Sequence, residues 1–223
     1  MKKRDIKDLL YEQVSRIGKA LSSPKRLEVL ELLAQGEKTV EALAQEAGID
    51  MKLTSAHLRS LREARLVETR REGKYIVYRL SGKDVAALWI TLRGVAEEHL
   101  VELKVALDQL VSLPERLSPV DRKTLLRRAE KNEIIVLDVR SQHEYEAGHL
   151  PFARSMPVHE IERRLSELPK GKEIVAYCRG AFCLMSDEAV KLLAAKGFQV
   201  SKLAEGVTDW QAAGLPVHTD SPD

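Results

Sequence analysis

The stretch TVEALAQEAGIDMKLTSAHLRSLREARLVETRREGKYIVYRL, residues 39–80, decides the fold of the first half of the chain. Its opening part carries apolar residues at helical spacing, namely Val40, Leu43, Ala44 and Ala47. Gly48 then stands where a helix is expected to end, because glycine readily adopts the left-handed backbone of a helix C-terminus. A second helix is predicted immediately afterwards, and two helices joined by a short glycine turn indicate a helix-turn-helix.

The second predicted helix, residues 51–64, separates apolar from polar side chains. We expect Leu53, Leu58 and Leu61 to be buried on one side. The candidates for DNA contacts on this helix are Lys52, Thr54, Ser55, His57, Arg59 and Arg62. A recognition helix reads base edges in the major groove, so the polar Thr54, Ser55 and His57 are candidates for sequence specificity.

A β-hairpin is predicted over residues 66–80, where two alternating runs flank Glu72 and Gly73, and after a helix-turn-helix such a hairpin is the wing. Its tip carries Arg70, Arg71 and Lys74. Residues 51–80 contain eight Lys or Arg against three Glu, whereas the whole chain has a net charge of only +2. This local basic patch favours double-stranded DNA as a partner, since such cations neutralise phosphates.

Length and composition indicate two small globular domains. The 223 residues are 44% hydrophobic and 31% charged, enough apolar surface for ordinary cores. Two prolines near residues 113–119 mark a boundary, so we expect a DNA-binding and dimerisation domain over 1–112, a linker over 113–118 and a second domain over 119–223. Without a long apolar run or a secretory signal, we expect a cytoplasmic protein that does not bind a membrane.

The second half alternates strands with helices. The runs IIVLDV and EIVAYC are almost wholly apolar, which is typical of a parallel sheet covered on both faces. The predicted elements are a helix at 122–131, a strand at 134–139, a helix at 161–168, a strand at 173–177, a helix at 186–196 and a strand at 199–203. The fold class is therefore a mainly α winged helix-turn-helix followed by an α/β domain.

The chain has two cysteines, Cys178 and Cys183, five residues apart. Cys178 stands at the carboxyl end of a predicted strand, before a helix, where backbone N–H groups and the helix N-terminus stabilise a thiolate. We therefore expect a nucleophilic thiol at Cys178. Two interpretations of Cys183 stay open. It reacts with a persulfide on Cys178, forming a disulfide or a bridged polysulfide, or it only fills a small position at the helix start.

Residues 10–110 resemble the ArsR/SmtB family of bacterial repressors. The resemblance lies in GKALSSPKRLEVLELLAQGEKTVEALAQEAGI and SAHLRSLREARLVETRREGKYIVYRLS. It implies a homodimeric repressor on an operator, with the first helix and a long helix over about 84–111 forming the interface. The segment EKTVEAL lacks the cysteines of the family's metal sites. Glu98, His99 and Glu102 could bind a metal from the dimer helix, but a solvated face is favoured, so we expect no metal and no other cofactor.

Residues 119–218 resemble the rhodanese family. The matching stretches are LDVRSQHEYEAGHLPFA, IVAYCRG, GFQV and LAEGVTDWQAAGLPV. The resemblance implies that Cys178 carries sulfur as a persulfide, that Asp138 and Arg140 brace its loop, and that His149 is structural. The six-residue loop CRGAFC ends in Cys183 and not in Arg, which favours sulfur over phosphate. Phe152 and Ala181 stand where the family often has Gly.

Arg179 is the remaining candidate in the loop. Its guanidinium could stabilise an anionic persulfide or orient a donor such as thiosulfate, a polysulfide or a low-molecular-weight persulfide, or it could simply face solvent. We expect a repressor whose DNA affinity responds to sulfane sulfur on Cys178. Two alternatives are a sulfurtransferase with an attached DNA-binding domain, and a metalloid sensor that uses both thiols as ligands.

Overall fold

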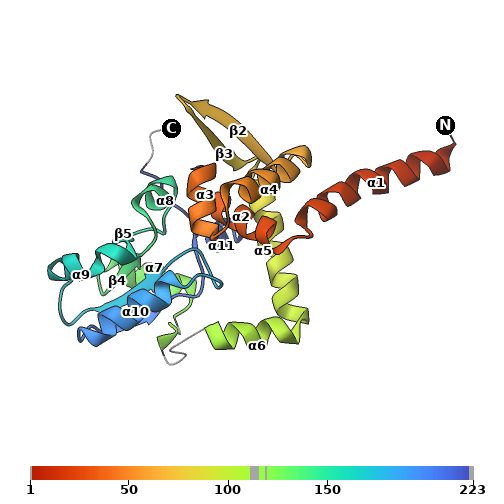
Figure 1. Ribbon diagram of the computed structural model, residues 1–223. Helices are drawn as coiled ribbons and strands as arrows, with labels where there is room; N and C mark the ends of the chain where they lie inside the picture. The colour runs from red at the N-terminus through yellow and green to blue at the C-terminus, as the bar shows by residue number, and fades with distance from the viewer. Residues whose placement is uncertain (1, 111–115, 119, 221–223) are drawn as a thin grey trace. The chain divides into compact units, whose positions relative to one another are not determined.

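The computed structural model describes residues 2–110, 116–118 and 120–220 (Figure 1). They divide into two compact units, and the division falls between Thr91 and Leu92. Half of the predicted linker, residues 113–115 of 113–118, lies outside the described residues, so the predicted domain boundary stays a prediction. None of the helices in the described parts of the chain is long and apolar enough to cross a bilayer.

The first unit contains the predicted helix-turn-helix and wing. Its elements are α1 (Lys3–Leu21), α2 (Pro24–Ala34), β1 (Lys38–Thr39), α3 (Val40–Ala47), α4 (Met51–Glu63), β2 (Val67–Glu72), β3 (Tyr75–Leu80) and the start of α5 (Lys83–His99). The three strands form an antiparallel sheet in the order β1-β3-β2. Strand β1 was not predicted, because two residues are too few to show a period.

Local capping explains where the two helices of the motif begin and end. The Thr39 hydroxyl accepts a hydrogen bond from the Ala42 N–H at 3.3 Å, and the Asp50 carboxylate accepts one from the Leu53 N–H at 2.9 Å. Gly48 ends α3 in the left-handed conformation, with φ 61°, as predicted. At the wing, Gly73 has φ 58° and the hairpin closes with Glu72 opposite Tyr75.

The core of the first unit corrects one expectation. Leu58 and Leu61 are fully buried with residues of α2 and α3, as predicted. Leu53 was expected beside them, but it is 43% exposed. The buried face of α4 is formed by Thr54, Leu58 and Leu61, at helical spacing, and Leu53 lies outside this face.

The predicted long helix over 84–111 is wrong as a continuous element. Helix α5 ends at His99, and a separate helix α6 (Val101–Leu110) follows. Leu100 serves both helices, because its N–H donates to the Ala96 carbonyl at 2.9 Å and its carbonyl accepts from the Lys104 N–H at 3.3 Å. The Lys104 ammonium also donates to the Glu98 carbonyl at 3.0 Å. Neither proline nor glycine marks this break, so the sequence pattern did not reveal it.

The second unit is an α/β layer structure. Besides α6 it contains α7 (Arg122–Glu130), β4 (Ile134–Asp138), α8 (Gln142–Ala147), β5 (Arg154–Ser155), α9 (Ile161–Arg164), β6 (Glu173–Tyr177), α10 (Met185–Ala195), β7 (Val200–Lys202) and α11 (Val207–Ala212). All strand pairs are parallel, in the order β5-β4-β6-β7. Helices α8 and α11 and strand β5 were not predicted, since each spans too few residues for a clear period.

Both faces of this sheet are buried, as the apolar strands predicted. One face carries Ile135, Leu137, Ile174 and Ala176 in a core that also includes residues of α9 and α10. The other carries Ile134, Val136, Val175 and Tyr177, packed with residues of α7 and α11. Alternate residues of one strand thus enter two cores, and the carboxyl ends of β4 and β6 meet at one edge, where the candidate site lies.

Candidate functional site

Cys178 directly follows β6 and begins the loop that leads to α10. Only 1% of the residue is exposed. Its Sγ lies 3.1 Å from the Ser186 hydroxyl oxygen, in the first turn of α10, and 3.7 Å from the Cys183 carbonyl oxygen. The loop therefore curls around the thiol and surrounds it with polar groups.

These contacts change the acidity of the two thiols in opposite directions. Burial by itself would raise the pKa of Cys178, but hydrogen bonds from the Cys183 thiol, the Ser186 side chain and nearby backbone groups outweigh it and lower this pKa to about 6. The hydrogen bond to Cys178 and burial raise the pKa of Cys183 well above its ordinary value. Near neutral pH, Cys178 is thus the thiolate and Cys183 the thiol that donates to it. Both cysteines are free.

The backbone of this loop is held closely by the segment before α11. A Cβ placed on Gly206 would clash with the Arg179 carbonyl oxygen and lie 2.8 Å from that of Cys178. The Gly206 N–H donates to the Asp209 carboxylate at 2.8 Å. Only glycine allows such a close approach, so Gly206 helps to define the position of Cys178.

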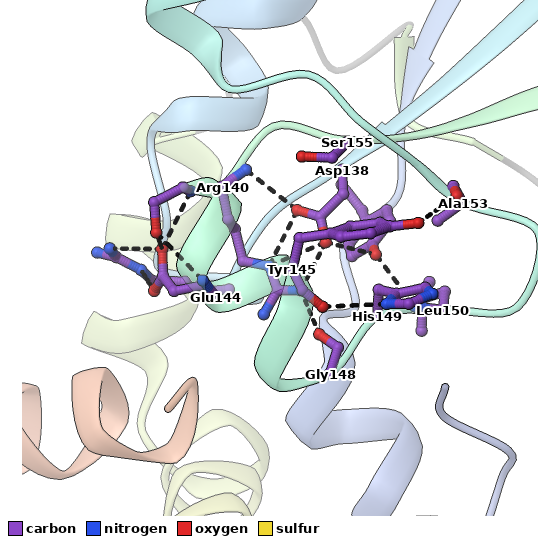
Figure 2. Close-up of polar contacts among 12 residues, drawn as sticks. Asp138, Arg140, Glu144, Tyr145, Gly148, His149, Leu150, Ala153 and Ser155 are labelled. Atoms are coloured by element: carbon purple, nitrogen blue, oxygen red, sulfur yellow. Dashed lines mark hydrogen bonds and ion pairs between the residues drawn. The ribbon is translucent and has the colours of Figure 1, made fainter. Parts of the chain in front are cut away.

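Asp138 and Arg140 lie in a fully buried network at the end of β4 (Figure 2). One carboxylate oxygen of Asp138 accepts from the Arg140 Nε at 3.0 Å, and the other accepts from the Tyr177 hydroxyl at 2.6 Å. The Arg140 Nη2 also donates to the Gly148 carbonyl at 2.7 Å. Tyr177 immediately precedes Cys178. Asp138 and Arg140 are therefore linked to the start of the loop through the Tyr177 hydroxyl.

Arg179 forms an ion pair with Glu144 of α8. The Arg179 Nε donates to one carboxylate oxygen at 2.7 Å and its Nη2 to the other at 3.1 Å. The Glu144 side chain is fully buried, and that of Arg179 is 16% exposed. Of the roles expected for Arg179, the solvent-facing cation is therefore excluded, and the expected contact with a donor has to compete with this ion pair.

His149 has the surroundings of a structural residue, as expected. Its ring stacks on that of Tyr145 (Figure 2) at a centroid distance of 3.9 Å. The His149 backbone pairs with that of His218. Phe152, at a position where glycine was expected, has φ 64°, a conformation that side chains rarely adopt. Ala181, by contrast, is not among the residues with positive φ.

Sequence reasoning missed two residues of this site. Ser186 was taken only as the start of a helix, and Glu144 was not singled out. The spacing of Ser141 and Glu144 is a capping box, a readable signal that could have identified Glu144 at the start of α8. Nothing local indicated that it would reach Arg179, 35 residues away.

Helix α4 presents most of its predicted DNA-contact residues to solvent. Lys52, Ser55, Arg59 and Arg62 are exposed, and His57 is half-buried. Burial, together with the nearby Arg26, lowers the pKa of His57, so its imidazole is neutral at pH 7. Thr54 was proposed as a base contact, but it is fully buried and its hydroxyl donates to the Asp50 carbonyl at 2.9 Å. We therefore remove it from the set.

The wing residues differ in how they are engaged. Arg70 pairs with Glu37 at 2.6 Å and with Glu72 at 2.8 Å. The Arg71 Nε donates to the Gly73 carbonyl at 3.1 Å, and the Lys74 ammonium lies 5.2 Å from the Tyr75 ring centroid. Arg71 and Lys74 thus remain candidates for phosphate contacts, whereas Arg70 would first have to break its ion pairs with Glu37 and Glu72.

No metal site is formed by the side chains of the described residues. Glu98, His99 and Glu102 do not come together, and no group of three or more His, Cys, Asp or Glu in the described ranges is arranged to hold an ion.

Comparison with known proteins identifies both halves of the chain. The model of the bacterial regulatory protein arsR family matches residues 23–69, and that of the rhodanese-like domain matches residues 121–213. The chain is 44% identical to the HTH-type transcriptional regulator Rv0324 of Mycobacterium tuberculosis over 98% of its own length and 96% of the relative's.

Two further relatives each match one half. A sulfurtransferase of Allochromatium vinosum is 32% identical over 45% of this chain and 94% of its own. The solved homodimeric winged helix-turn-helix DNA-binding domain (fragment 1–100) of Mb0332 from Mycobacterium bovis is 46% identical, covers 46% of this chain and 93% of its own, and has a TM-score of 0.42. The chain therefore belongs to the ArsR family of transcriptional regulators and carries a rhodanese domain in its second half.

Proposed function

We propose that this regulator is a repressor whose affinity for DNA changes when Cys178 carries a persulfide. The observation that supports this most is the environment of the Cys178 thiol, which is held by Ser186 and Cys183 and has its pKa lowered to about 6. Such a thiol is a thiolate at neutral pH and attacks sulfane sulfur. The 32% identity to a sulfurtransferase is in line with sulfur chemistry in this half.

DNA binding is assigned to α4 and the wing. Exposed cations on α4, together with Arg71 and Lys74, would neutralise phosphates, and Ser55 and the neutral His57 would contact base edges. This arrangement matches what a recognition helix and a basic hairpin require.

A homodimer is the proposed binding form. Helix α1 exposes a series of large apolar side chains, between 42% and 70% exposed: Ile6, Leu9, Leu10, Tyr11 and Val14. An apolar face of this size favours burial against a partner. The Mycobacterium bovis relative is described as homodimeric. A second copy covering α1 would place two recognition helices on one operator, with half-sites related by the dimer axis.

The expected change in DNA affinity on modification of the Cys178 thiol can be estimated from the usual size of allosteric coupling free energies. A ligand or modification shifts affinity only by the difference in its free energy between the two binding states, and allosteric couplings of about 1–3 kcal/mol change affinity roughly 5- to 150-fold. Adding a sulfur atom inside the loop would disturb the hydrogen bonds from Ser186 and Cys183, since the thiol is already enclosed. We expect DNA affinity to fall when this loop rearranges.

The decisive experiment measures binding of the purified protein to its own upstream DNA at fixed salt, before and after polysulfide treatment, with the modification confirmed by mass spectrometry. We expect affinity to fall at least several-fold in the wild type and to stay unchanged in Cys178→Ser. Persulfidation of Cys178 without any change in affinity would refute the sensor.

Catalytic sulfur transfer is the second candidate, supported by the same thiolate and by the sulfurtransferase relative. Steady-state turnover with a sulfur donor and cyanide separates the two. Rapid turnover that depends on Cys178, together with unchanged DNA affinity, would favour an enzyme, whereas a single slow modification that changes affinity would favour a sensor.

A further inference from the structure

The cation nearest to Cys178 in the sequence, Arg179, is neutralised within the fold. Its guanidinium and the Glu144 carboxylate meet fork to fork, with two hydrogen bonds of 2.7 and 3.1 Å to different oxygens. This geometry is the strongest that an arginine and a carboxylate form. The carboxylate is fully buried, so water does not screen the pair from that side.

Glu144 is itself fixed in place. Its second carboxylate oxygen also accepts hydrogen bonds from the Ser141 hydroxyl at 3.0 Å and from the Ser141 N–H at 3.3 Å. Ser141 directly follows Arg140, which is anchored in the buried network with Asp138 (Figure 2). The carboxylate therefore cannot follow Arg179 toward a ligand. If Arg179 turned to an incoming anion, it would leave a buried negative charge without its partner, which is costly.

We infer that Glu144 is a positioning residue that sets donor specificity: by neutralising Arg179, it makes Cys178 accept sulfur from weakly charged persulfides in preference to dianionic thiosulfate. This inference rests on the proposed persulfide chemistry of Cys178. A thiolate repels an anionic donor, and the repulsion grows with the donor's charge unless a free cation offsets it. Both arginines at this loop are paired with carboxylates, Arg179 with Glu144 and Arg93, which lies over the Phe182 ring, with Asp209 and Glu97. Neither charge is available to offset that of the donor, so thiosulfate has the greater barrier.

Both donors transfer one sulfur atom to the Cys178 thiolate. With a persulfide donor, the Cys178 thiolate attacks the outer sulfur of R–S–SH, a new S–S bond forms, the donor's S–S bond breaks, and R–S⁻ leaves while Cys178 holds –S–SH. With thiosulfate, the thiolate attacks the outer sulfur and sulfite leaves with two negative charges, so that Cys178 holds –S–S⁻. Neither reaction needs an external oxidant or reductant, because one sulfur atom moves with its oxidation state unchanged.

The test compares rate constants for persulfidation of Cys178 by cysteamine persulfide, whose ammonium offsets the charge of its perthiolate, and by thiosulfate, followed by mass spectrometry at pH 7. The proteins are the wild type, Glu144→Gln, Arg179→Gln and the double variant. We expect the wild type to prefer the persulfide by at least roughly tenfold, and Glu144→Gln to narrow this ratio several-fold by speeding up the thiosulfate reaction. In the double variant the ratio should return toward the wild-type value.

The double variant distinguishes specificity from structure. If Glu144 only supports the loop, both donors slow together and removing Arg179 restores nothing. A ratio that stays the same in Glu144→Gln, or a changed ratio that persists in the double variant, would overturn the inference.

The wild type provides a measurement that does not depend on how the variants fold. Its thiosulfate rate should rise with ionic strength, because salt screens like charges, and a rate that falls with salt would also overturn the inference. Donor discrimination without any change in DNA affinity would leave this inference standing while refuting the sensor.

Discussion

The hydrogen bond from Cys183 to the Cys178 thiolate makes a quantitative prediction for the variant Cys183→Ala. Hydrogen bonds to charged groups contribute about 1.5–3 kcal/mol, and one pKa unit corresponds to about 1.4 kcal/mol. Losing this bond should therefore raise the pKa of Cys178 by roughly one to two units from its value of about 6. The direction follows because the donor stabilises only the charged form.

The rates should change in opposite directions at the two ends of the pH range. At about pH 6 the variant has far less thiolate, and although each thiolate is more nucleophilic, its reaction with a disulfide should be roughly two- to sixfold slower than that of the wild type. At about pH 9 both proteins are ionised, and the more basic thiolate of the variant should react roughly three- to sevenfold faster. A crossing of the two pH profiles is thus expected.

The assay follows the first-phase reaction of Cys178 with dipyridyl disulfide by absorbance across this pH range. Cys183→Ser is the matched control, because its hydroxyl retains a donor and should shift the pKa less. Cys178→Ser should not react. If the profiles of Cys183→Ala and the wild type coincide, Cys183 does not cause the acidity of Cys178, and the assignment of roles to the two thiols is refuted.

Four further predictions concern packing, strain, assembly and DNA contacts. Gly206→Ala should lower both the Tm and the reactivity of Cys178 at pH 7, because its Cβ meets the loop backbone; unchanged reactivity in a folded variant would contradict this. Phe152→Gly should leave the free energy of unfolding unchanged or increase it by up to about 1 kcal/mol, as measured by thermal unfolding. The reason is that glycine relieves about 1–2 kcal/mol of backbone strain at φ 64°, which exceeds the cost of the extra conformational entropy that glycine loses on folding. Val14→Glu should yield a monomer in light scattering and lower operator affinity by roughly tenfold or more, whereas a stable dimer would exclude α1 from the interface. Ser55→Ala should alter preference among operators with single base-pair changes by about 1 kcal/mol, and Thr54→Ser should not, since Thr54 is buried.

Local periodicity determined which elements this chain forms. The helix-turn-helix, the wing and the parallel sheet could be predicted because their sequence patterns depend on neighbours within a few residues. These patterns are the apolar residues at helical spacing before Gly48, the alternation around Gly73, and the all-apolar strands leading to Asp138 and Cys178. The same spacing placed Cys178 at the end of a strand. Short helices such as α8 and α11 were not predicted, because they contain too few residues to show a period.

Only the tertiary structure decided what each polar side chain meets. Arg179 finds Glu144 across 35 residues, the Cys178 thiol finds Ser186 at the start of the next helix, and Gly206 closes on the loop from another segment. On α4, packing turned Thr54 inward and left Leu53 exposed. These partners are brought together by the packing of distant segments, and hydrophobic periodicity carries no information about pairs that are far apart in sequence. The chain alone thus indicates a reactive cysteine and a basic recognition helix, whereas the acidity of the thiol and the neutralised charge beside it arise from the folded arrangement.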